Sequence, residues 1–190
     1  MAIPIGHCLA GYAVHGLFNP SERRKGGHLA VLCVFAAVFP DLDVVPGIVM
    51  GQPVLFHQGV THSMGFALVV STAIALASHL RGTAFVTVFG LCFLCYASHL
   101  LIDFFGPDAR PPYGIPLLWP LSDEYFISPV PIFLGVRHAR SPTASIAEWA
   151  TRMFDLYNVA AIILEVVVIS PFVVAARHFG GPVTSPQQTD

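Results

Sequence analysis

Three short motifs combine histidine and aspartate, the side chains that bind divalent metal ions in proteins. They contribute Asp41 and Asp43 in PDLD, His57 and His62 in HQGVTHS, and His99 and Asp103 in SHLLID. Residues four positions apart share one face of a helix, so His99 and Asp103 can bind the same ion. The Asp-x-Asp pair offers two oxygen donors that can bridge two ions. Mixed nitrogen and oxygen ligands favour zinc or another borderline divalent metal.

Five apolar stretches must position these motifs. They cover about residues 3–18, 28–39, 64–80, 83–105 and 156–176. The last two reach the roughly 20 apolar residues that a membrane-spanning helix needs, and the first three are shorter. Two carboxylates are costly in lipid unless they face a protein-lined or watery cavity. We therefore expect the second helix to be broken at Pro40–Asp43 or tilted, with residues 44–56 as a re-entrant or interfacial segment.

The order of the stretches brings the three motifs to one side of the membrane. PDLD ends the second stretch, HQGVTHS precedes the third and SHLLID ends the fourth, so each crossing returns the chain to the same side. The start of the first stretch is expected there too. We predict a metal site with the ligands His7, Asp41, His62, His99 and Asp103. We predict catalytic roles for Asp43 and His57, which would orient a water or accept its proton, although either could instead be a ligand or support one.

The composition indicates a membrane protein. Of the 190 residues, 55% are hydrophobic and 11% are charged, and the mean hydropathy is +0.70. Soluble domains carry about 25% charged residues. These values exclude a nucleic-acid binder that relies on a basic patch, a disordered linker and a disulfide scaffold. We predict an all-α, polytopic membrane protein with about five transmembrane or partly embedded helices. It would form one domain over residues 1–180, followed by a disordered tail at 181–190.

Residues 106–155 differ from the rest because prolines and aromatic residues are frequent there. We expect an ordered loop at the membrane interface, followed by a short amphipathic helix. Ser145 would cap this helix, and Glu148 would complete a capping box. The apolar positions of the helix would be Ile146, Trp149, Met153 and Leu156.

Most other polar residues of the apolar stretches are expected to be structural. These are His15, His28, His79 and His178, and the cysteines Cys8, Cys33, Cys92 and Cys95 as small hydrophobic side chains. The role of His138 stays open. Glu165 lies in the middle of the last stretch, where an unpaired carboxylate is costly. We expect it either to pair with His15 or to stay protonated, and a direct catalytic role is a further alternative.

The basic residues indicate an orientation. Those expected on the side away from the motifs are Arg23, Arg24, Lys25, Arg81 and Arg177. Those expected on the motif side are Arg110, Arg137, Arg140 and Arg152. Because the first loop usually dominates, we expect the metal site to face the extracytoplasmic side. The arginines at 110, 137 and 140 are also candidates for binding a phosphate or lipid headgroups.

The sequence resembles a bacterial family of membrane-bound metal-dependent hydrolases, the YdjM/YbcI-like group. The matching segments follow in the expected order over about residues 3–126: IPIGHCLAGYAVH, FPDLD, HQGVTHS, SHLLIDFFG and YGIPLLWPLSDEYF. The family more often has arginine where this chain has Gln58, which removes a positive charge beside the site. A fainter similarity is to zinc-dependent phospholipase C and its nuclease relatives, whose ligand order matches that of the five predicted ligands. Those enzymes have a further His and a His-x3-Glu pair without a convincing counterpart here.

These resemblances imply a metal-dependent hydrolase of the bacterial inner membrane. The implied reaction is hydrolysis of a phosphoester in a lipid or lipid-linked substrate by a metal-activated water. The implied cofactor is one or two divalent ions, zinc in the first place and manganese or iron as alternatives. The lipid bilayer is the expected surrounding, and no nucleic-acid partner is expected. The alternative functions are a metal-ion or proton transporter and a non-enzymatic stress-response membrane protein.

Overall fold

The computed structural model describes residues 3–18, 27–52, 55–108, 111–137 and 146–179. Several expectations lie outside this part of the chain. They concern the tail at 181–190, the basic residues 23–25, Arg110, His138, Arg140, the cap Ser145 and the side chains of Ile146, Trp149 and Met153.

All regular elements of the described residues are helices. The long helices are α1 (Pro4–Phe18), α2 (Gly27–Val38), α4 (Met64–His79), α5 (Phe85–Phe104) and α7 (Leu156–Phe179). The short elements are α3 (Val44–Val49), α6 (Ile146–Met153) and two 3-10 turns at Phe39–Asp43 and Val60–His62. The helix predicted after the loop is therefore α6, although Leu156 belongs to α7. The predicted all-α class is confirmed.

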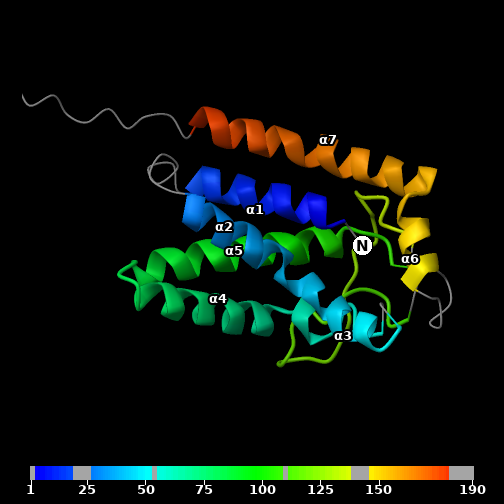
Figure 1. The fold of residues 1–190 in the computed structure, drawn as a ribbon, viewed down its shortest axis with the longest axis horizontal. Helices are drawn as coiled ribbons and strands as arrows, with labels where there is room; N and C mark the ends of the chain where they lie inside the picture. Colours follow the sequence, from blue (N-terminus) through cyan, green and yellow to red (C-terminus); the bar gives the residue numbers. More distant parts are fainter. Residues whose placement is uncertain (1–2, 19–26, 53–54, 109–110, 138–145, 180–190) are drawn as a thin grey trace, which may run out of the picture.

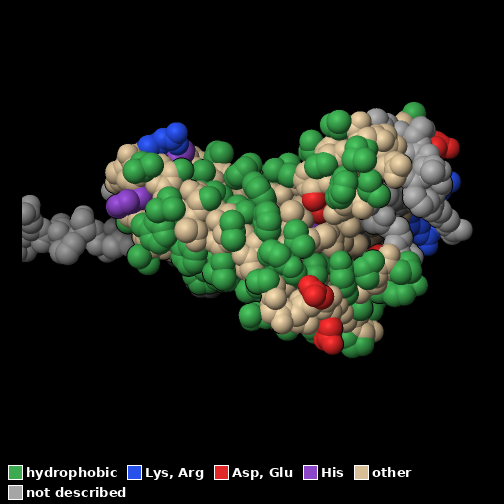
Figure 2. Space-filling model, turned by 90° about the horizontal axis from the view of Figure 1, so that it is seen from below, with side chains coloured by type: hydrophobic (Ala, Val, Ile, Leu, Met, Phe, Trp, Pro, Cys, Tyr) green, Lys and Arg blue, Asp and Glu red, His purple; other side chains and the backbone are tan. Residues whose placement is uncertain are grey.

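The long helices lie side by side along the length of the molecule (Figure 1). α1 packs against α2, α5 and α7, and α4 packs against α5. Three helical segments are long and apolar enough to cross a membrane: Gly27–Val49, Phe85–Phe104 and Leu156–His178. The apolar α4 is shorter, and α1 has 15 residues. On the face shown in Figure 2, hydrophobic side chains cover the middle of the molecule, and Lys and Arg side chains lie toward its two ends.

The α-helix of the second membrane segment is interrupted at the predicted place, Pro40–Asp43, although the chain stays helical there. α2, the 3-10 turn at Phe39–Asp43 and α3 form one helical run of 23 residues, Gly27–Val49. Pro40 stands at the start of the 3-10 turn, where its fixed φ and missing N–H are tolerated. The proline thus changes the winding of the helix without ending it. Residues 44–49 form the short helix α3, and the re-entrant or interfacial position of residues 44–56 stays a prediction.

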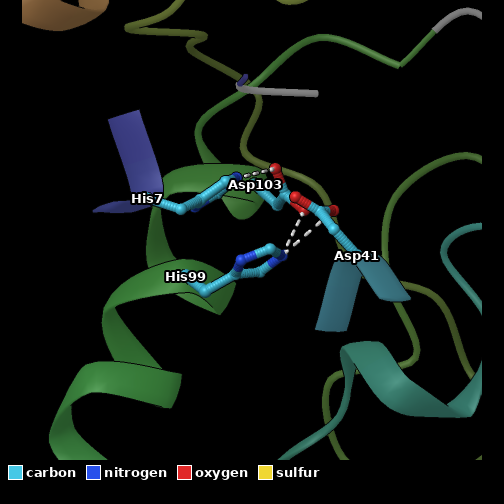
Figure 3. Close-up of side chains that lie close together, drawn as sticks. All are labelled: His7, Asp41, His99 and Asp103. Atoms are coloured by element: carbon cyan, nitrogen blue, oxygen red, sulfur yellow. Dashed lines mark ion pairs between the residues drawn. The ribbon is translucent and has the colours of Figure 1, made fainter. Parts of the chain in front are cut away.

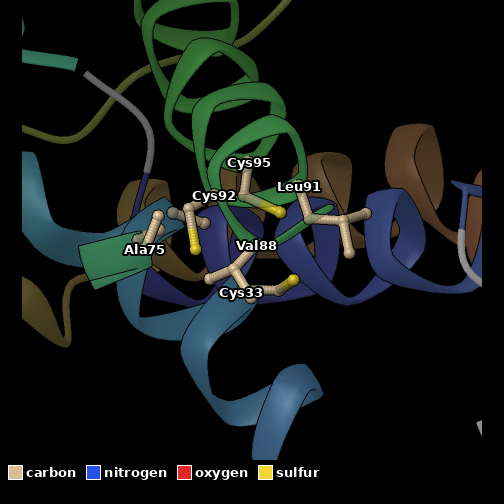
Figure 4. Close-up of a cluster of buried hydrophobic side chains, with 8 residues drawn as sticks. Cys33, Ala75, Val88, Leu91, Cys92 and Cys95 are labelled. Carbon is tan, nitrogen blue, oxygen red and sulfur yellow. The ribbon is translucent and has the colours of Figure 1, made fainter. Parts of the chain in front are cut away.

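A close-packed core of small side chains lies between α2, α4 and α5 (Figure 4). Cys33, Cys92 and Cys95 are fully buried in it, and all three are free thiols. Small residues allow helices to approach closely. A Cβ atom on Gly11 of α1, for example, would lie only 2.6 Å from the Cβ of Ala37 in α2. The burial of the three cysteines agrees with their predicted role as small hydrophobic residues.

The proline-rich segment after α5 folds across one end of the bundle. Ile115 and Phe126 form an antiparallel bridge, with N–H···O distances of 3.0 and 2.8 Å. The N–H of Met64, at the start of α4, donates to the carbonyl of Leu117 at 2.9 Å. This bond satisfies one of the N–H groups that the first turn of a helix leaves unpaired. The segment therefore ties the start of α4 to the end of α5, and its position at a membrane interface stays a prediction.

Candidate metal site

Four ligand-type side chains from three helical segments meet at one end of the bundle (Figure 3). His7 lies near the start of α1, Asp41 in the first 3-10 turn, and His99 and Asp103 near the end of α5. One ligand atom from each lies within 4.8 Å of the others. His99 Nε2 is 3.2 Å from Asp103 Oδ2, and His7 Nε2 is 3.6 Å from Asp103 Oδ1. The imidazole rings of His7 and His99 are stacked, with their centroids 3.6 Å apart.

A second group of ligand atoms shares Asp41 with the first. Asp41, His57 and His62 also offer atoms within 4.8 Å of one another. Asp41 Oδ1 lies 3.7 Å from His62 Nε2 and 3.9 Å from His57 Nε2. His62 Nε2 is 3.4 Å from Asp103 Oδ2, which links the two groups again. The structure therefore brings the five predicted ligands and His57 into one cluster, while their role as ligands stays a prediction.

A backbone hydrogen bond determines which nitrogen of His99 faces the cluster. His99 Nδ1 lies 2.8 Å from the carbonyl oxygen of Ala37. Because a carbonyl oxygen can only accept, Nδ1 carries the proton and Nε2 presents its lone pair to Asp41 and Asp103. Metal-binding histidines typically have one ring nitrogen held in this way by a carbonyl or carboxylate.

Asp43 holds two histidines from their other side. Its Oδ1 accepts a hydrogen bond from His57 Nδ1 at 2.7 Å, and its Oδ2 accepts one from Thr61 Oγ1 at 2.8 Å. His62 Nδ1 lies 3.1 Å from Thr61 Oγ1 and 3.3 Å from Asp43 Oδ2. The Nε2 atoms of both rings are the ones close to Asp41. Asp43 is thus positioned to orient the two rings, and the catalytic roles of Asp43 and His57 stay predictions.

The cluster contains buried nitrogen atoms that a cation would satisfy. Among the described residues, the Nε2 atoms of His7, His62 and His99 are buried without a hydrogen-bond partner. Such atoms are rare and energetically costly. A tetrahedral zinc ion with bonds of about 2.0–2.1 Å separates its ligand atoms by roughly 3.3–3.4 Å. Between the predicted ligands, the separations of histidine and aspartate atoms are 3.2–3.7 Å, close to that value, and His57 Nε2 is farther from Asp41, at 3.9 Å. The donor set therefore fits a divalent metal ion.

Three carboxylates surround His62. Burial by itself lowers the pKa of His62, but the nearby carboxylates of Asp103, Asp41 and Asp43 outweigh this effect and hold the pKa well above its usual value. The negative charge of the aspartates therefore demands a positive charge at this point. A metal ion could supply that charge in place of a proton.

The cluster is most accessible at Asp41 and His57. Their side chains are 13% and 7% exposed, whereas those of His7, His62 and His99 are 0% exposed. A reacting group would therefore approach the cluster from the side of Asp41 and His57.

Glu165 of α7 binds the start of α1. The backbone N–H of Ile3 donates to both carboxylate oxygens of Glu165, each at 3.0 Å. A Cβ atom on Gly6 would lie 2.5 Å from Glu165 Oε2, so glycine leaves space for the carboxylate. His15 lies in the last turn of α1, at the opposite end from Ile3. The predicted pairing of Glu165 with His15 is therefore wrong, because the carboxylate meets the other end of this helix.

The other predicted structural residues lie away from the cluster. His28, His79 and His178 are exposed at the far ends of α2, α4 and α7, and His15 is buried at the far end of α1. The guanidinium of Arg137 lies 3.6 Å from the centre of the Tyr157 ring. This arginine, predicted to bind phosphate or headgroups, stacks on an aromatic ring outside the cluster.

Three supporting residues were not predicted from the sequence. Thr61 connects Asp43 to His62, and the hydroxyl of Tyr96 donates to the carbonyl of Thr61 at 2.5 Å. Gln58 has a φ of 65°, in the left-handed region, directly after His57. The sequence contained a signal for two of these residues. Thr61 lies inside the motif HQGVTHS, and Tyr96 precedes His99 by three residues on the same helix. The backbone of Gln58 carries no such signal.

Comparisons with known proteins agree with a membrane location. The sequence matches the family of the YdjM inner membrane protein over residues 1–178. It is 34% identical over 106 residues to the inner membrane protein YbcI of Escherichia coli strain K12. The alignment covers 50% of this chain and 56% of that protein. The chain thus aligns with little more than half of that curated relative. No solved structure matches the chain. The family match covers nearly the whole chain and agrees with the three membrane-length helices. The chain therefore belongs to the YdjM inner membrane protein family.

Proposed function

We propose that this protein is a membrane-embedded, metal-dependent hydrolase that cleaves a phosphoester in a lipid or lipid-linked substrate. The observation that carries the proposal is the arrangement around Asp41, whose Oδ1 lies within 3.9 Å of Nε2 of His57, His62 and His99. Two adjacent ligand groups suit phosphoester hydrolysis, in which paired ions stabilise the attacking and the leaving oxygen.

The residues of the cluster have separate roles in this proposal. One or two divalent ions, zinc in the first place, are held by His7, Asp41, His62, His99 and Asp103. When bound, the metal supplies Lewis-acid activation of water and of a phosphoryl oxygen. Asp43 keeps the proton on Nδ1 of His57 and fixes the ring. His57, at the accessible edge, uses Nε2 to orient the attacking water or accept its proton.

The interior behind the cluster favours a hydrolase over a transporter. The space between α2, α4 and α5 is filled by the apolar core that contains Cys33, Ala75, Cys92 and Cys95. A path for ions or protons across a membrane requires polar side chains or water along its length. Among the described residues, the groups of His and Asp side chains close enough to share an ion lie at one end of the bundle, and the histidines at the other end are not part of such a group.

The proposed site faces the extracytoplasmic side. Arg81 follows α4 and Arg177 lies in the last turn of α7, both at the end of the bundle away from the cluster. Basic residues near the ends of membrane helices favour the cytoplasmic side. Arg137 and Arg152 lie on the cluster side, so the balance depends on Arg23, Arg24 and Lys25, which follow α1 in the sequence and belong to the first loop, whose charges usually dominate. The cluster, at the other end, then lies outside the cytoplasm.

Metal analysis of the purified protein tests the site. We expect the wild-type protein to retain one or two zinc, manganese or iron ions per chain, measured by mass spectrometry of the elements. His99→Ala and Asp103→Ala should each lose most of this metal, because each removes a ligand from the buried group. The matched control is His79→Ala, since His79 is exposed at the far end of α4. Absence of stoichiometric metal from the wild type, or full retention in both variants, contradicts the site.

A substrate screen tests the reaction. Purified protein in detergent is incubated with common phospholipids and polyprenyl phosphates, and the release of phosphate or headgroup is measured. We expect release that chelators abolish and that the same metal restores, with His79→Ala as active as the wild type. Release from none of these lipids by the metal-loaded protein contradicts phosphoester hydrolysis of lipids.

A further inference from the structure

An apolar groove runs beside the metal cluster. Its volume is about 550 Å³. One wall consists of Phe39, Leu42 and Pro46, which belong to the membrane-length helical run Gly27–Val49. The other wall includes Phe56, Val60 and Phe66, from the segment that carries His57 and His62 and from the start of α4. The groove therefore lies between a membrane helix and the histidine motif.

Two polar residues connect the groove to the cluster. Asp43 and Thr61 both line the groove and are hydrogen-bonded to each other at 2.8 Å. Asp43 also binds His57, one of the two accessible residues of the cluster. A molecule in the groove would thus have its apolar part against the phenylalanines and its polar end next to Asp41 and His57.

The surroundings of the groove are hydrophobic as well. Leu42, Phe56 and Val60 are 44–45% exposed, and Val45 and Val49 on the outer side of the helical run are 51% and 82% exposed. In a protein of the inner membrane, apolar side chains exposed on a membrane-length helix contact lipid tails. An apolar groove that continues this surface is filled more favourably by hydrocarbon than by water.

We propose that this groove binds a hydrocarbon chain of a membrane lipid and so presents the lipid's phosphate-bearing end to the metal cluster. The inference rests on the proposed function and names the substrate subsite that this function requires. A soluble phosphoester with the same head has no hydrocarbon chain to fill the groove, so the groove distinguishes a membrane lipid from it.

Native mass spectrometry of the protein in detergent tests the groove. The protein is incubated with an equimolar mixture of dioleoyl phosphatidic acid, phosphatidylglycerol and phosphatidylethanolamine, and separately with glycerol 3-phosphate. We expect the wild type to retain about one of these lipids per chain and no glycerol 3-phosphate. Val60→Trp places a large side chain in the groove from a position that is 44% exposed, and should lower lipid retention at least tenfold.

Two further variants control this test. Val69→Trp adds the same side chain to an exposed position of α4 outside the groove, and should retain lipid like the wild type. Leu42→Trp obstructs the groove from its other wall, so the test still works if Val60→Trp does not fold. Metal content is measured on every sample and should be equal in Val60→Trp and Val69→Trp.

The outcomes separate the groove from the proposed function. The groove is overturned if a folded groove variant, Val60→Trp or Leu42→Trp, retains as much lipid as the wild type. It is also overturned if the wild type retains no lipid. If the metal and the hydrolysis persist in that case, the proposed function stands without the groove. The opposite outcome is also possible: the wild type retains lipid and the groove variants lose it, but neither metal nor hydrolysis is detected. In that case the groove stands and the proposed function falls.

Discussion

The carboxylate of Asp43 accepts a hydrogen bond from Nδ1 of His57 at 2.7 Å. Asp41, two residues earlier, lies 3.9 Å from Nε2 of the same ring. One motif thus contacts both nitrogens of one imidazole, with Asp43 holding the ring and Asp41 in the centre of the cluster. This division of roles leads to the first prediction.

Asp43→Asn should weaken metal binding by about 10–100-fold, the usual effect of losing a carboxylate that orients a ligating histidine. The asparagine keeps the size of the side chain but removes the charge that lies 3.3 Å from Nδ1 of His62, one of the proposed ligands. The measurement is a competition titration with a chelating dye. Asp123→Asn, in an exposed position of the loop, is the control and should bind metal like the wild type. An unchanged affinity in Asp43→Asn would mean that Asp43 does not orient the ligands.

Glu165→Ala should weaken both the fold and the metal site. The substitution leaves the N–H of Ile3 without its acceptor, and hydrogen bonds to charged groups contribute about 1.5–3 kcal/mol. His7 lies one helical turn after Ile3, so we also expect about tenfold weaker metal binding. Glu165→Gln keeps an oxygen acceptor and should lose less of both. The measurements are thermal unfolding in detergent and metal titration.

A double variant separates positioning from general destabilisation. If Glu165 acts on the site through His7, Glu165→Ala should reduce metal affinity in the wild type and have little further effect when His7→Ala is already present. Equal losses in both backgrounds would show that Glu165 supports the fold without positioning His7.

The left-handed backbone at Gln58 predicts an unusual pattern of tolerance. Gln58→Gly should keep the metal and the thermal midpoint of the wild type, because glycine adopts a φ of 65° without strain. Gln58→Val should cost about 1–2 kcal/mol of stability and lower the metal content, since a β-branched residue is strained there and His57 is adjacent. Gln52→Val is the matched control, because it also replaces a glutamine side chain by valine but at a position without a positive φ. A valine variant as stable as the glycine variant would contradict the prediction.

Reporter fusions test the orientation of the site. Because α5 ends and α7 begins at the cluster end, alkaline phosphatase fused after residue 137 should be active if the cluster is extracytoplasmic. Green fluorescent protein fused after residue 190 should be fluorescent, because α7 ends on the opposite side. The reverse pattern, with a fluorescent fusion at 137 and an active phosphatase at 190, would place the cluster in the cytoplasm.

The convergence of the site could be predicted from the sequence because it depends on two regular features. The spacing of His99 and Asp103 is that of one helix face, and both lie in the same group in the structure. The apolar stretches alternate in direction, so motifs at their ends return to one end of the bundle. Neither feature requires knowledge of side-chain packing.

The parts that could not be predicted depend on tertiary contacts or on small differences in backbone geometry. The partner of His99 Nδ1 is a main-chain carbonyl, that of Ala37, and any residue type can supply such an acceptor. The partner of Glu165 is likewise the main-chain N–H of Ile3. At Pro40, sequence rules predict the interruption of the α-helix that the structure shows, but they do not predict that a 3-10 turn fills it and keeps the chain helical.

The hydrogen bond between Ile3 and Glu165 joins residues that are 162 positions apart. Ribosomal synthesis proceeds from the N-terminus, so α1 emerges long before the helix that secures its first turn. His7 therefore reaches its final place only after α7 has entered the bilayer. We therefore expect the His and Asp cluster to be completed late in the biogenesis of this protein, and the proposed metal to bind only after the last helix is inserted.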